Sequence, residues 1–265
     1  MTTRIAVAGA AGRMGREVLA AAPGYSDLAL VGAIVRPETD PARLPAFGDA
    51  GCRVVDDPAA LAGAVDVMVD FTNPAATVVL ADWCARAGVG FVSGTTGLSP
   101  EQIVRLDAAA ARVPVFHARN MSPGIDAILR ALPALLAALP GYDVEIVETH
   151  HRHKRDAPSG TALAIAETVA KAIEAHLPDD AVFGREGIAP RRGGEIGIHA
   201  VRGGGNPGEH AIVIAGDGEE IRLAHRSFGR RAYADGALRA ARFVAGRPPG
   251  RYGMADLAEG EGGRR

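Results

Sequence analysis

The segment RIAVAGAAGRMG, residues 4–15, decides how the first half of the chain folds. Its apolar run at 4–8 predicts a buried strand, and the pattern that follows the glycines predicts a helix. Gly9, Gly12 and Gly15 lie in between, where glycine permits a tight turn, close approach of the backbone to a pyrophosphate, and close helix–sheet packing. The first two glycines are three residues apart, unlike the usual GxGxxG. The segment predicts a dinucleotide-binding turn, with an ordinary glycine-rich turn as the alternative.

Apolar runs and helical patterns alternate through the rest of the first half. We expect further strands at 27–35, 65–71, 89–94 and 113–118, with helices at 74–87 and 100–111. Nearly continuous apolar strands separated by helices indicate a parallel sheet covered on both faces. With right-handed crossovers, this is an α/β fold with a Rossmann-like doubly wound parallel sheet.

The pattern changes after about residue 121. A long helix at 122–139 contains Pro133, which is expected to kink or split it. The following elements are a strand at 142–149, a helix at 161–176, strands at 195–202, 209–216 and 219–226, and a helix at 231–245. Short glycine-bearing turns join the last three strands, and GDG at 216–218 is typical of a hairpin. These elements predict a second domain of α+β type with an antiparallel or mixed sheet.

Bulk properties exclude several classes of protein. The chain has 265 residues, enough for one large or two modest domains. Its net charge of -2 argues against nucleic acid or an anionic membrane surface as a main partner. Cys52 and Cys84 are too few for a disulfide framework, and the N-terminus resembles neither a signal peptide nor a membrane span. We therefore expect a cytoplasmic protein with neither a nucleic-acid nor a membrane partner.

The residues at the end of the second expected strand should determine whether the chain prefers NAD or NADP. An acid at this point holds the ribose 2′-hydroxyl of NAD, whereas an arginine accommodates the 2′-phosphate of NADP. In GAIVRPE (32–38), Val35 takes the position of the acid and Arg36 follows it. This favours NADPH, with a merely solvated Arg36 as the alternative.

Three polar loops follow expected strands: DFTNP (70–74), SGTTG (93–97) and ARNMS (118–122). Loops at the carboxyl ends of parallel strands line the ligand crevice of such sheets. Thr95, Thr96 and the backbone beside Gly94 are therefore candidates to meet the nicotinamide ribose or carboxamide. Ordinary turn chemistry is the alternative for each loop.

HHRHKRDAPSGTA (150–162) concentrates histidines and cations. A metal site is disfavoured because the histidines are too close together and the neighbouring lysine and arginines repel a cation. A nucleic-acid patch is disfavoured because the segment has no aromatic residues between its cations. A solvated basic loop is kept as an alternative. An anion pocket explains more, because DAPSGTA is typical of a helix start, with Asp156 or Ser159 as cap, whose N–H groups and dipole attract a carboxylate.

The same segment also offers proton donors. Histidine and lysine exchange protons near neutral pH, and neighbouring cations lower the pKa of a lysine. Together with the glycine turn, the segment indicates reduction of a small carboxylate-bearing substrate by a nicotinamide cofactor, with a proton delivered from this loop.

Five segments, in their order and spacing, resemble the 4-hydroxy-tetrahydrodipicolinate reductase family, also called dihydrodipicolinate reductases: VAGAAGRMG (7–15), DFTNP, SGTTG, ETHHRHKRDAPSGTA (148–162) and GEH (208–210). The resemblance covers nearly the whole chain. The histidine-lysine segment with DAPSGTA is highly specific, whereas the glycine turn is not. The resemblance implies an NADPH- or NADH-dependent reductase of the diaminopimelate route to lysine, acting on a cyclic imine dicarboxylate without a metal.

The resemblance also implies a role for each matching position. His150 is implied as proton donor and acceptor, Lys154 as second proton donor, and His151 as a substrate contact. Gly160 and Thr161 would bind a substrate carboxylate at the helix start. The implied cofactor contacts are Gly9, Ala10, Ala11, Gly12, Arg13 and Met14 at the pyrophosphate, Arg36 at the adenosine ribose, and Gly94, Thr95, Thr96, Ala118, Arg119, Asn120 and Met121 at the nicotinamide end.

The family's C-terminal segment returns to the nucleotide domain. We therefore expect a dinucleotide-binding domain at 1–121 and 232–265, and a substrate-binding and tetramerisation domain at 122–231 that builds a homotetramer through its sheet. Many family members carry an acid where Val35 stands, and the pairs Asn206-Pro207 and Phe228-Gly229 also depart from the family pattern. A related Rossmann reductase of another imino or oxo acid and a non-catalytic NADPH-binding sensor stay open as alternatives.

Overall fold

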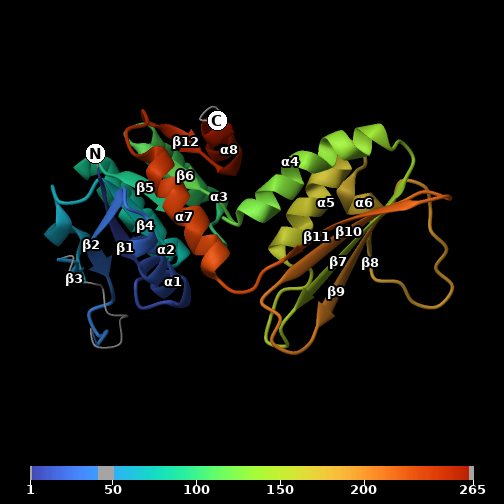
Figure 1. Cartoon of the computed structure of the whole chain (residues 1–265), viewed down its shortest axis with the longest axis horizontal. Coiled ribbons are helices and arrows are strands. Elements are labelled where there is room, and N and C mark those ends of the chain that lie inside the picture. Colours follow the sequence, from blue (N-terminus) through green and yellow to red (C-terminus); the bar gives the residue numbers. More distant parts are fainter. Residues whose placement is uncertain (1, 41–50, 263–265) are drawn as a thin grey trace. The chain divides into compact units, whose positions relative to one another are not determined.

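The computed structural model of the chain (Figure 1) describes residues 2–40 and 51–262. They form two compact units, one of Met1–Pro123 with Arg230–Arg265 and one of Gly124–Gly229. The first unit is discontinuous in sequence, because the chain leaves it after Pro123 and returns at Arg230. In the described ranges, no helix combines the length and the apolar character needed to cross a membrane.

The first unit contains a seven-stranded sheet in the order β12-β6-β5-β4-β1-β2-β3, in which every pair is parallel. Its strands are β1 (Thr3–Ala8), β2 (Leu28–Ile34), β3 (Arg53–Val55), β4 (Val67–Asp70), β5 (Gly90–Ser93), β6 (Pro114–His117) and β12 (Gly250–Tyr252). The predicted doubly wound sheet is confirmed. The edge strands β3 and β12 were not predicted, because three residues are too few to show a pattern.

Helices cover both faces of this sheet. They are α1 (Arg13–Ala21), α2 (Pro74–Ala87), α3 (Pro100–Ala110), α7 (Arg231–Val244) and α8 (Met254–Gly262), with short 3-10 turns at Ala22–Gly24 and Pro58–Leu61. Alternate residues of β1 point to opposite faces, so Ile5 and Val7 pack in the core with α1 and α7. Ala6 and Ala8 pack in the other core, with α2 and α3. Residues 5–8 of β1, an inner strand of the sheet, are buried on both sides, which explains their continuous apolar sequence.

The second unit has a five-stranded mixed sheet in the order β11-β10-β7-β9-β8. Strand β10 runs antiparallel to β7 and β11, whereas β9 runs parallel to β7 and β8. The elements are α4 (Pro123–Ala138), β7 (Asp143–His150), α5 (Gly160–Ala172), α6 (Leu177–Asp180), β8 (Ala181–Phe183), β9 (Ile196–Arg202), β10 (Glu209–Ala215) and β11 (Glu220–Arg226). The predicted mixed sheet is confirmed. Pro133 lies inside α4 without splitting it.

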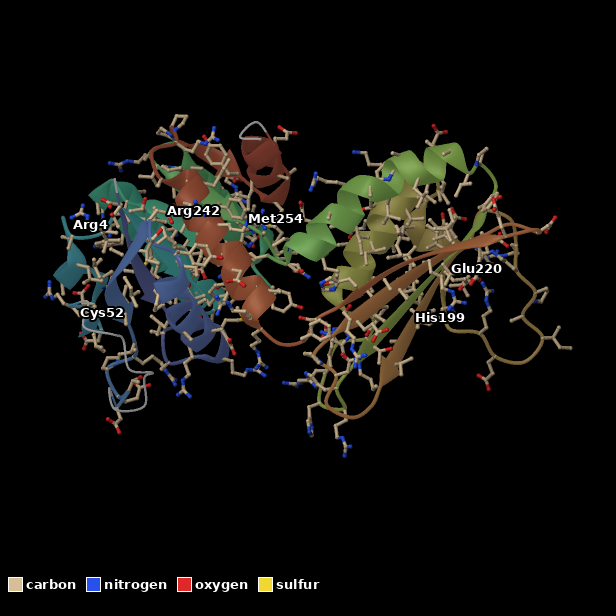
Figure 2. All side chains as sticks on the ribbon, in the orientation of Figure 1. Arg4, Cys52, His199, Glu220, Arg242 and Met254 are labelled. Carbon is tan, nitrogen blue, oxygen red and sulfur yellow. The ribbon has the colours of Figure 1, made fainter. Side chains whose placement is uncertain are left out.

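Helices α4 and α5 pack on one face of this second sheet (Figures 1 and 2). Val144 and Ile146 of β7 point to that face and are buried among leucines of α4 and apolar residues of α5. The same alternation carries Glu148 and His150 to the helix-covered face at the end of the strand. The core of the second unit therefore ends in a polar cluster next to the start of α5.

Candidate active site

The glycine turn lies between β1 and α1 and has no room for side chains at two positions. Gly9 has a φ of +75°, and a Cβ there would lie 2.6 Å from the Phe71 carbonyl oxygen. A Cβ on Gly15 would lie 2.2 Å from the Gly9 carbonyl oxygen. Gly12 is the N-cap of α1 but has no side chain to cap it, and the first turn carries no acid. The N–H groups of this turn thus suit a pyrophosphate, which fits a dinucleotide.

A pocket of about 470 Å³ opens at this helix start. Its lining comes from residues 12–14, from 71–74 after β4, from 94–96 after β5, and from Arg230. The structure therefore brings together six of the predicted cofactor residues: Gly12, Arg13, Met14, Gly94, Thr95 and Thr96. A Cβ on Gly94 would lie 2.2 Å from the Phe71 ring, so glycine is required beside that aromatic wall. Arg230, just before α7, was not among the predicted site residues.

The other predicted cofactor residues do not line this pocket. Gly9, Ala10 and Ala11 form the turn, in which the Gly9 and Ala10 N–H groups both donate to the Ile34 carbonyl, at 3.1 and 3.2 Å. Ala118, Arg119, Asn120 and Met121 follow β6, and the Met121 side chain is buried in the core beside α7.

The end of β2 carries the predicted cofactor selector. Val35 is buried, whereas the Arg36 side chain is 84% exposed and its Nε lies 3.3 Å from Glu38 Oε1. No carboxylate occupies the position of Val35. The guanidinium of Arg36 is thus open to solvent, where its ion pair with Glu38 is weak.

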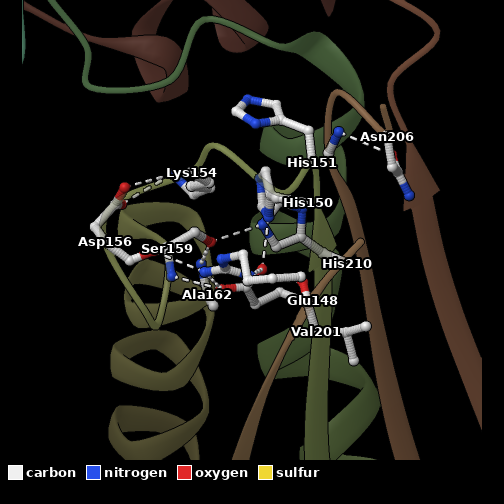
Figure 3. Close-up of polar contacts among 12 residues, drawn as sticks. Glu148, His150, His151, Lys154, Asp156, Ser159, Ala162, Val201, Asn206 and His210 are labelled. Carbon is white, nitrogen blue, oxygen red and sulfur yellow. Dashed lines mark hydrogen bonds and ion pairs between the residues drawn. The ribbon is translucent and has the colours of Figure 1, made fainter. Parts of the chain in front are cut away.

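The end of β7 places His150 against a buried carboxylate (Figure 3). Glu148 is fully buried, and its Oε2 lies 2.5 Å from His150 Nδ1. Its two oxygens also accept from both terminal nitrogens of Arg202, each at 2.7 Å, and from the Ser159 N–H at 2.9 Å. Because the carboxylate accepts, His150 carries its proton on Nδ1 and leaves Nε2 for other partners.

The charges of this pair follow from burial and neighbours. Burial alone would raise the pKa of Glu148, but hydrogen bonds from Arg202, His150 and Ser159 outweigh it and hold that pKa below its ordinary value. Burial lowers the pKa of His150, with Glu148 opposing this and Lys154 adding to it. The pair therefore consists of a carboxylate and a neutral imidazole at neutral pH.

A second histidine and a glycine shape the surroundings of His150. His210 is buried, its Nε2 lies 3.0 Å from Ser159 Oγ, and its ring meets the His150 ring edge-on at 5.2 Å. Burial, together with the nearby His150, lowers the pKa of His210 to about 4, so this ring is neutral. Gly208 has a φ of +152°, and a Cβ there would lie 3.0 Å from His150 Nε2. Glycine at 208 therefore keeps the reactive nitrogen uncovered.

Lys154 lies in the turn between β7 and α5. Its Nζ is 2.9 Å from both carboxylate oxygens of Asp156 (Figure 3). Of the two predicted caps, Ser159 is the N-cap of α5, because its Oγ accepts from the Ala162 N–H at 3.1 Å. Gly160 is the first residue of the helix, and the first turn contains no acid. Lys154 and this helix start together provide positive potential for a carboxylate.

The loop after β9 fixes the position of His151. The His151 N–H donates to the Asn206 carbonyl at 2.7 Å, and Asn206 Oδ1 accepts from the Gly208 N–H at 3.0 Å. Asn206, one of the departures from the family pattern, thus ties the glycine-rich loop to the histidine segment. Across the described ranges, no three histidine, cysteine, aspartate or glutamate side chains are grouped to hold a metal.

Sequence reasoning missed Glu148, Arg202 and His210. The alternation of β7 contained a signal for the first, because residues two apart on a strand share a face. Arg202 and His210 come from β9 and β10. Their approach depends on the strand order, which the sequence did not reveal.

Comparisons with known proteins cover nearly the whole chain. The family models described as dihydrodipicolinate reductase match residues 3–121 with their N-terminal part and 124–258 with their C-terminal part. The 4-hydroxy-tetrahydrodipicolinate reductase of Rubrobacter xylanophilus is 48% identical over 260 residues, covering 96% of this chain and 97% of that protein. The enzyme of the same name from Thermomicrobium roseum is 49% identical over 255 residues, covering 96% and 98%.

Solved structures show the same similarity. A dipicolinate-bound dihydrodipicolinate reductase from Paenisporosarcina sp. TG-14 superposes with a TM-score of 0.79 at 25% identity, covering 97% of this chain and 99% of that one. An amine dehydrogenase from Mycobacterium smegmatis has a TM-score of 0.59 at 18% identity, covering 97% and 96%, and shows the fold alone.

Proposed function

This chain belongs to the dihydrodipicolinate reductase family, and from that premise we propose that it reduces 4-hydroxy-tetrahydrodipicolinate to tetrahydrodipicolinate in lysine biosynthesis through diaminopimelate. One observation carries the proposal. A neutral imidazole held by a buried carboxylate, a lysine paired with Asp156, and a helix whose first turn carries no acid all lie within residues 148–162. This set combines proton exchange with carboxylate binding, as reduction of a dicarboxylate imine requires.

Substrate binding is assigned to the start of α5 and its flanking loop. The N–H groups of Gly160 and Thr161 lie in the first turn of α5, where the helix dipole favours a carboxylate. Lys154 adds a positive charge, and a substrate carboxylate would compete with Asp156 for its Nζ. His151 is assigned to the rim of the same site.

Proton exchange is assigned to His150 and Lys154. Overall, water is eliminated from the substrate as the hydroxyl of C4 leaves with a proton from the neighbouring carbon, and the resulting double bond then takes up one hydride at C4 and one proton at that neighbouring carbon. His150 Nε2 can accept or donate this proton, because Glu148 holds the other nitrogen in the protonated form. Lys154 is the second donor, and its charge also stabilises electron density that develops on the ring nitrogen.

A nicotinamide cofactor supplies the hydride when it is bound. The N–H groups at the start of α1 would hold its pyrophosphate, and the loops after β4 and β5 would surround its nicotinamide half. The absence of an acid at Val35 and the exposed guanidinium of Arg36 support a preference for NADPH over NADH. Ala118 to Met121 remain predicted contacts of the nicotinamide end.

The remaining proposals concern organisation. We assign cofactor binding to the first unit, and substrate binding and homotetramer formation to the second. The sheet face away from α4 and α5 supports assembly, because it carries partly exposed residues such as Val147 and His199, the latter labelled in Figure 2. A cytoplasmic location agrees with a biosynthetic role on a small metabolite.

A coupled assay tests the proposal. The condensation product of pyruvate and aspartate semialdehyde would be generated by its synthase in the presence of the purified protein, with NADPH and NADH in parallel. We expect cofactor oxidation that depends on the synthase and is faster with NADPH. No oxidation by protein that binds NADPH would favour another imino acid as substrate, or a sensor. Equal rates would refute only the cofactor preference.

A further inference from the structure

Asp70, the last residue of β4, is a fully buried carboxylate with five hydrogen bonds. Its Oδ1 accepts from the Thr72 N–H at 3.0 Å and from Thr72 Oγ1 at 2.5 Å. Its Oδ2 accepts from Thr77 Oγ1 at 2.7 Å, Ser93 Oγ at 2.8 Å and Thr95 Oγ1 at 3.1 Å. One side chain thus connects the loop after β4, helix α2, strand β5 and the loop after β5.

All five donors are neutral. Burying a carboxylate is costly unless hydrogen bonds replace its lost hydration, and here hydroxyl groups provide most of that replacement. A packing role alone would be served equally well by an apolar residue at the end of a buried strand. The charge of Asp70 at this buried position therefore points to a role in setting the direction in which the surrounding hydroxyl groups donate.

Each hydroxyl group has one proton and two lone pairs. When the proton points to Asp70, the oxygen can only accept from any other partner. Thr72 and Thr95 belong to the lining of the pocket, whereas Thr77 and Ser93 are fully buried. Because both hydroxyls donate to Asp70, the oxygens of Thr72 and Thr95 can accept hydrogen bonds from a ligand in the pocket but cannot donate to it.

The rest of Thr95 is also held in place. Its N–H donates to Ser93 Oγ at 3.2 Å, and its carbonyl oxygen lies 3.1 Å from His117 Nε2. Burial lowers the pKa of His117, so the neutral ring donates from Nε2 to this carbonyl. With its backbone groups engaged, Thr95 has the lone pairs of its hydroxyl oxygen left for a ligand.

We propose that Asp70 is a positioning residue that orients the Thr72 and Thr95 hydroxyls, so that the pocket binds the amino group of the nicotinamide carboxamide as a hydrogen-bond donor. The inference rests on the proposed function, because it assumes that the nicotinamide cofactor binds in this pocket. It adds a specificity rule: the pocket selects ligands with an N–H donor at this position over ligands of equal shape without one.

The test compares two oxidised cofactors by calorimetry, without turnover. One is NADP, and the other is its 3-acetylpyridine analogue, in which a methyl group replaces the amino group of the carboxamide. One lost hydrogen bond corresponds to about a tenfold change in affinity, so we expect wild type to prefer NADP by about tenfold. In Asp70→Asn, the new amino group faces donors, the hydroxyls reorient, and the preference should fall below about threefold.

A matched pair of valine variants separates orientation from packing. Thr95→Val removes an acceptor that lines the pocket, whereas Thr77→Val removes a buried donor to the same Asp70 oxygen. We expect Thr95→Val to lose the preference for NADP and Thr77→Val to keep it. These two variants distinguish hydroxyl orientation from packing even if Asp70→Asn does not fold.

Two results with the variants would overturn the inference: Asp70→Asn weakening both cofactors by the same factor, or Thr77→Val losing the preference as Thr95→Val does. If wild type binds both cofactors equally and still reduces its substrate, the proposed orientation of the hydroxyls is refuted, but the proposed function is not. A wild type that binds neither cofactor would instead refute the proposed function, so the two failures are distinguishable.

Discussion

Replacing Glu148 by glutamine tests whether the buried carboxylate organises the catalytic histidine. Each carboxylate oxygen accepts two hydrogen bonds, one of them from Arg202. A glutamine amide presents an NH₂ group in place of one oxygen. In either orientation that NH₂ faces two donors, namely Arg202 with His150 or Arg202 with Ser159.

The magnitude follows from burial. Glu148 is fully buried, and removing one partner of a buried, hydrogen-bonded charge pair costs about 3–5 kcal/mol. We therefore expect Glu148→Gln to lower the free energy of unfolding by about 3 kcal/mol. Without the carboxylate, His150 is no longer held with its proton on Nδ1, and a misplaced general acid–base group typically loses about 10²-fold in rate. We expect kcat to fall by about that factor, with little change in cofactor affinity.

The pH dependence gives an independent measure. The pKa of Glu148 is lower in the folded chain than in the unfolded chain, so ionised Glu148 stabilises the fold above its unfolded value of about 4.3. This contribution is lost as the pH falls through the folded pKa. Urea unfolding should therefore show the full difference between wild type and Glu148→Gln at pH 7, and a smaller difference as the pH falls below about 4.3.

Glu145→Gln is the matched control. Glu145 lies on the same strand but on the opposite face, where its Oε2 lies 2.5 Å from His199 Nε2. Its replacement should affect stability without a large effect on kcat. A folded Glu148→Gln variant with kcat within threefold of wild type would refute the role of Glu148 in orienting His150.

Three further predictions concern the assigned residues. His150→Gln and Lys154→Ala should each lower kcat at least 10²-fold while calorimetry shows unchanged NADPH affinity; full activity in both would remove them from catalysis. Arg36→Ala should raise the KM for NADPH about tenfold and leave that for NADH nearly unchanged, and equal effects would exclude contact with the 2′-phosphate. Gly208→Ala places a Cβ 3.0 Å from His150 Nε2 at a φ of +152°; steady-state kinetics should show a lower kcat, and an unchanged kcat would mean that this nitrogen is approached from another side.

Much of the first unit could be predicted because its strands are buried on both faces and therefore have continuous apolar sequences. The edge strands β3 and β12 escaped prediction, since three residues with one partner strand carry little pattern. In the second unit, the alternation of β7 indicated a strand, but its pairing with β9 and β10 brings distant residues together. This pairing explains why His150 was predicted while Arg202 and His210 were not.

Asp70 illustrates a different limit. An aspartate after an apolar strand is typical of a turn, and its five hydrogen bonds come from residues up to 25 positions away. Their convergence depends on β4 and β5 being neighbours in register, with Asp70 opposite Ser93. The chemistry of such a residue becomes visible only when the strand order is known.

The discontinuity of the first unit has a consequence for synthesis on the ribosome. Helix α7, at Arg231–Val244, fills one face of the first sheet with buried residues such as Leu238 and Val244. Until it leaves the exit tunnel, the nascent sheet exposes the part of that apolar face that α1 does not cover. The second unit is continuous from Gly124 to Gly229 and emerges complete before α7. We expect the later-encoded unit to fold first, and nascent chains that stall before residue 231 to depend on chaperones that bind the open face.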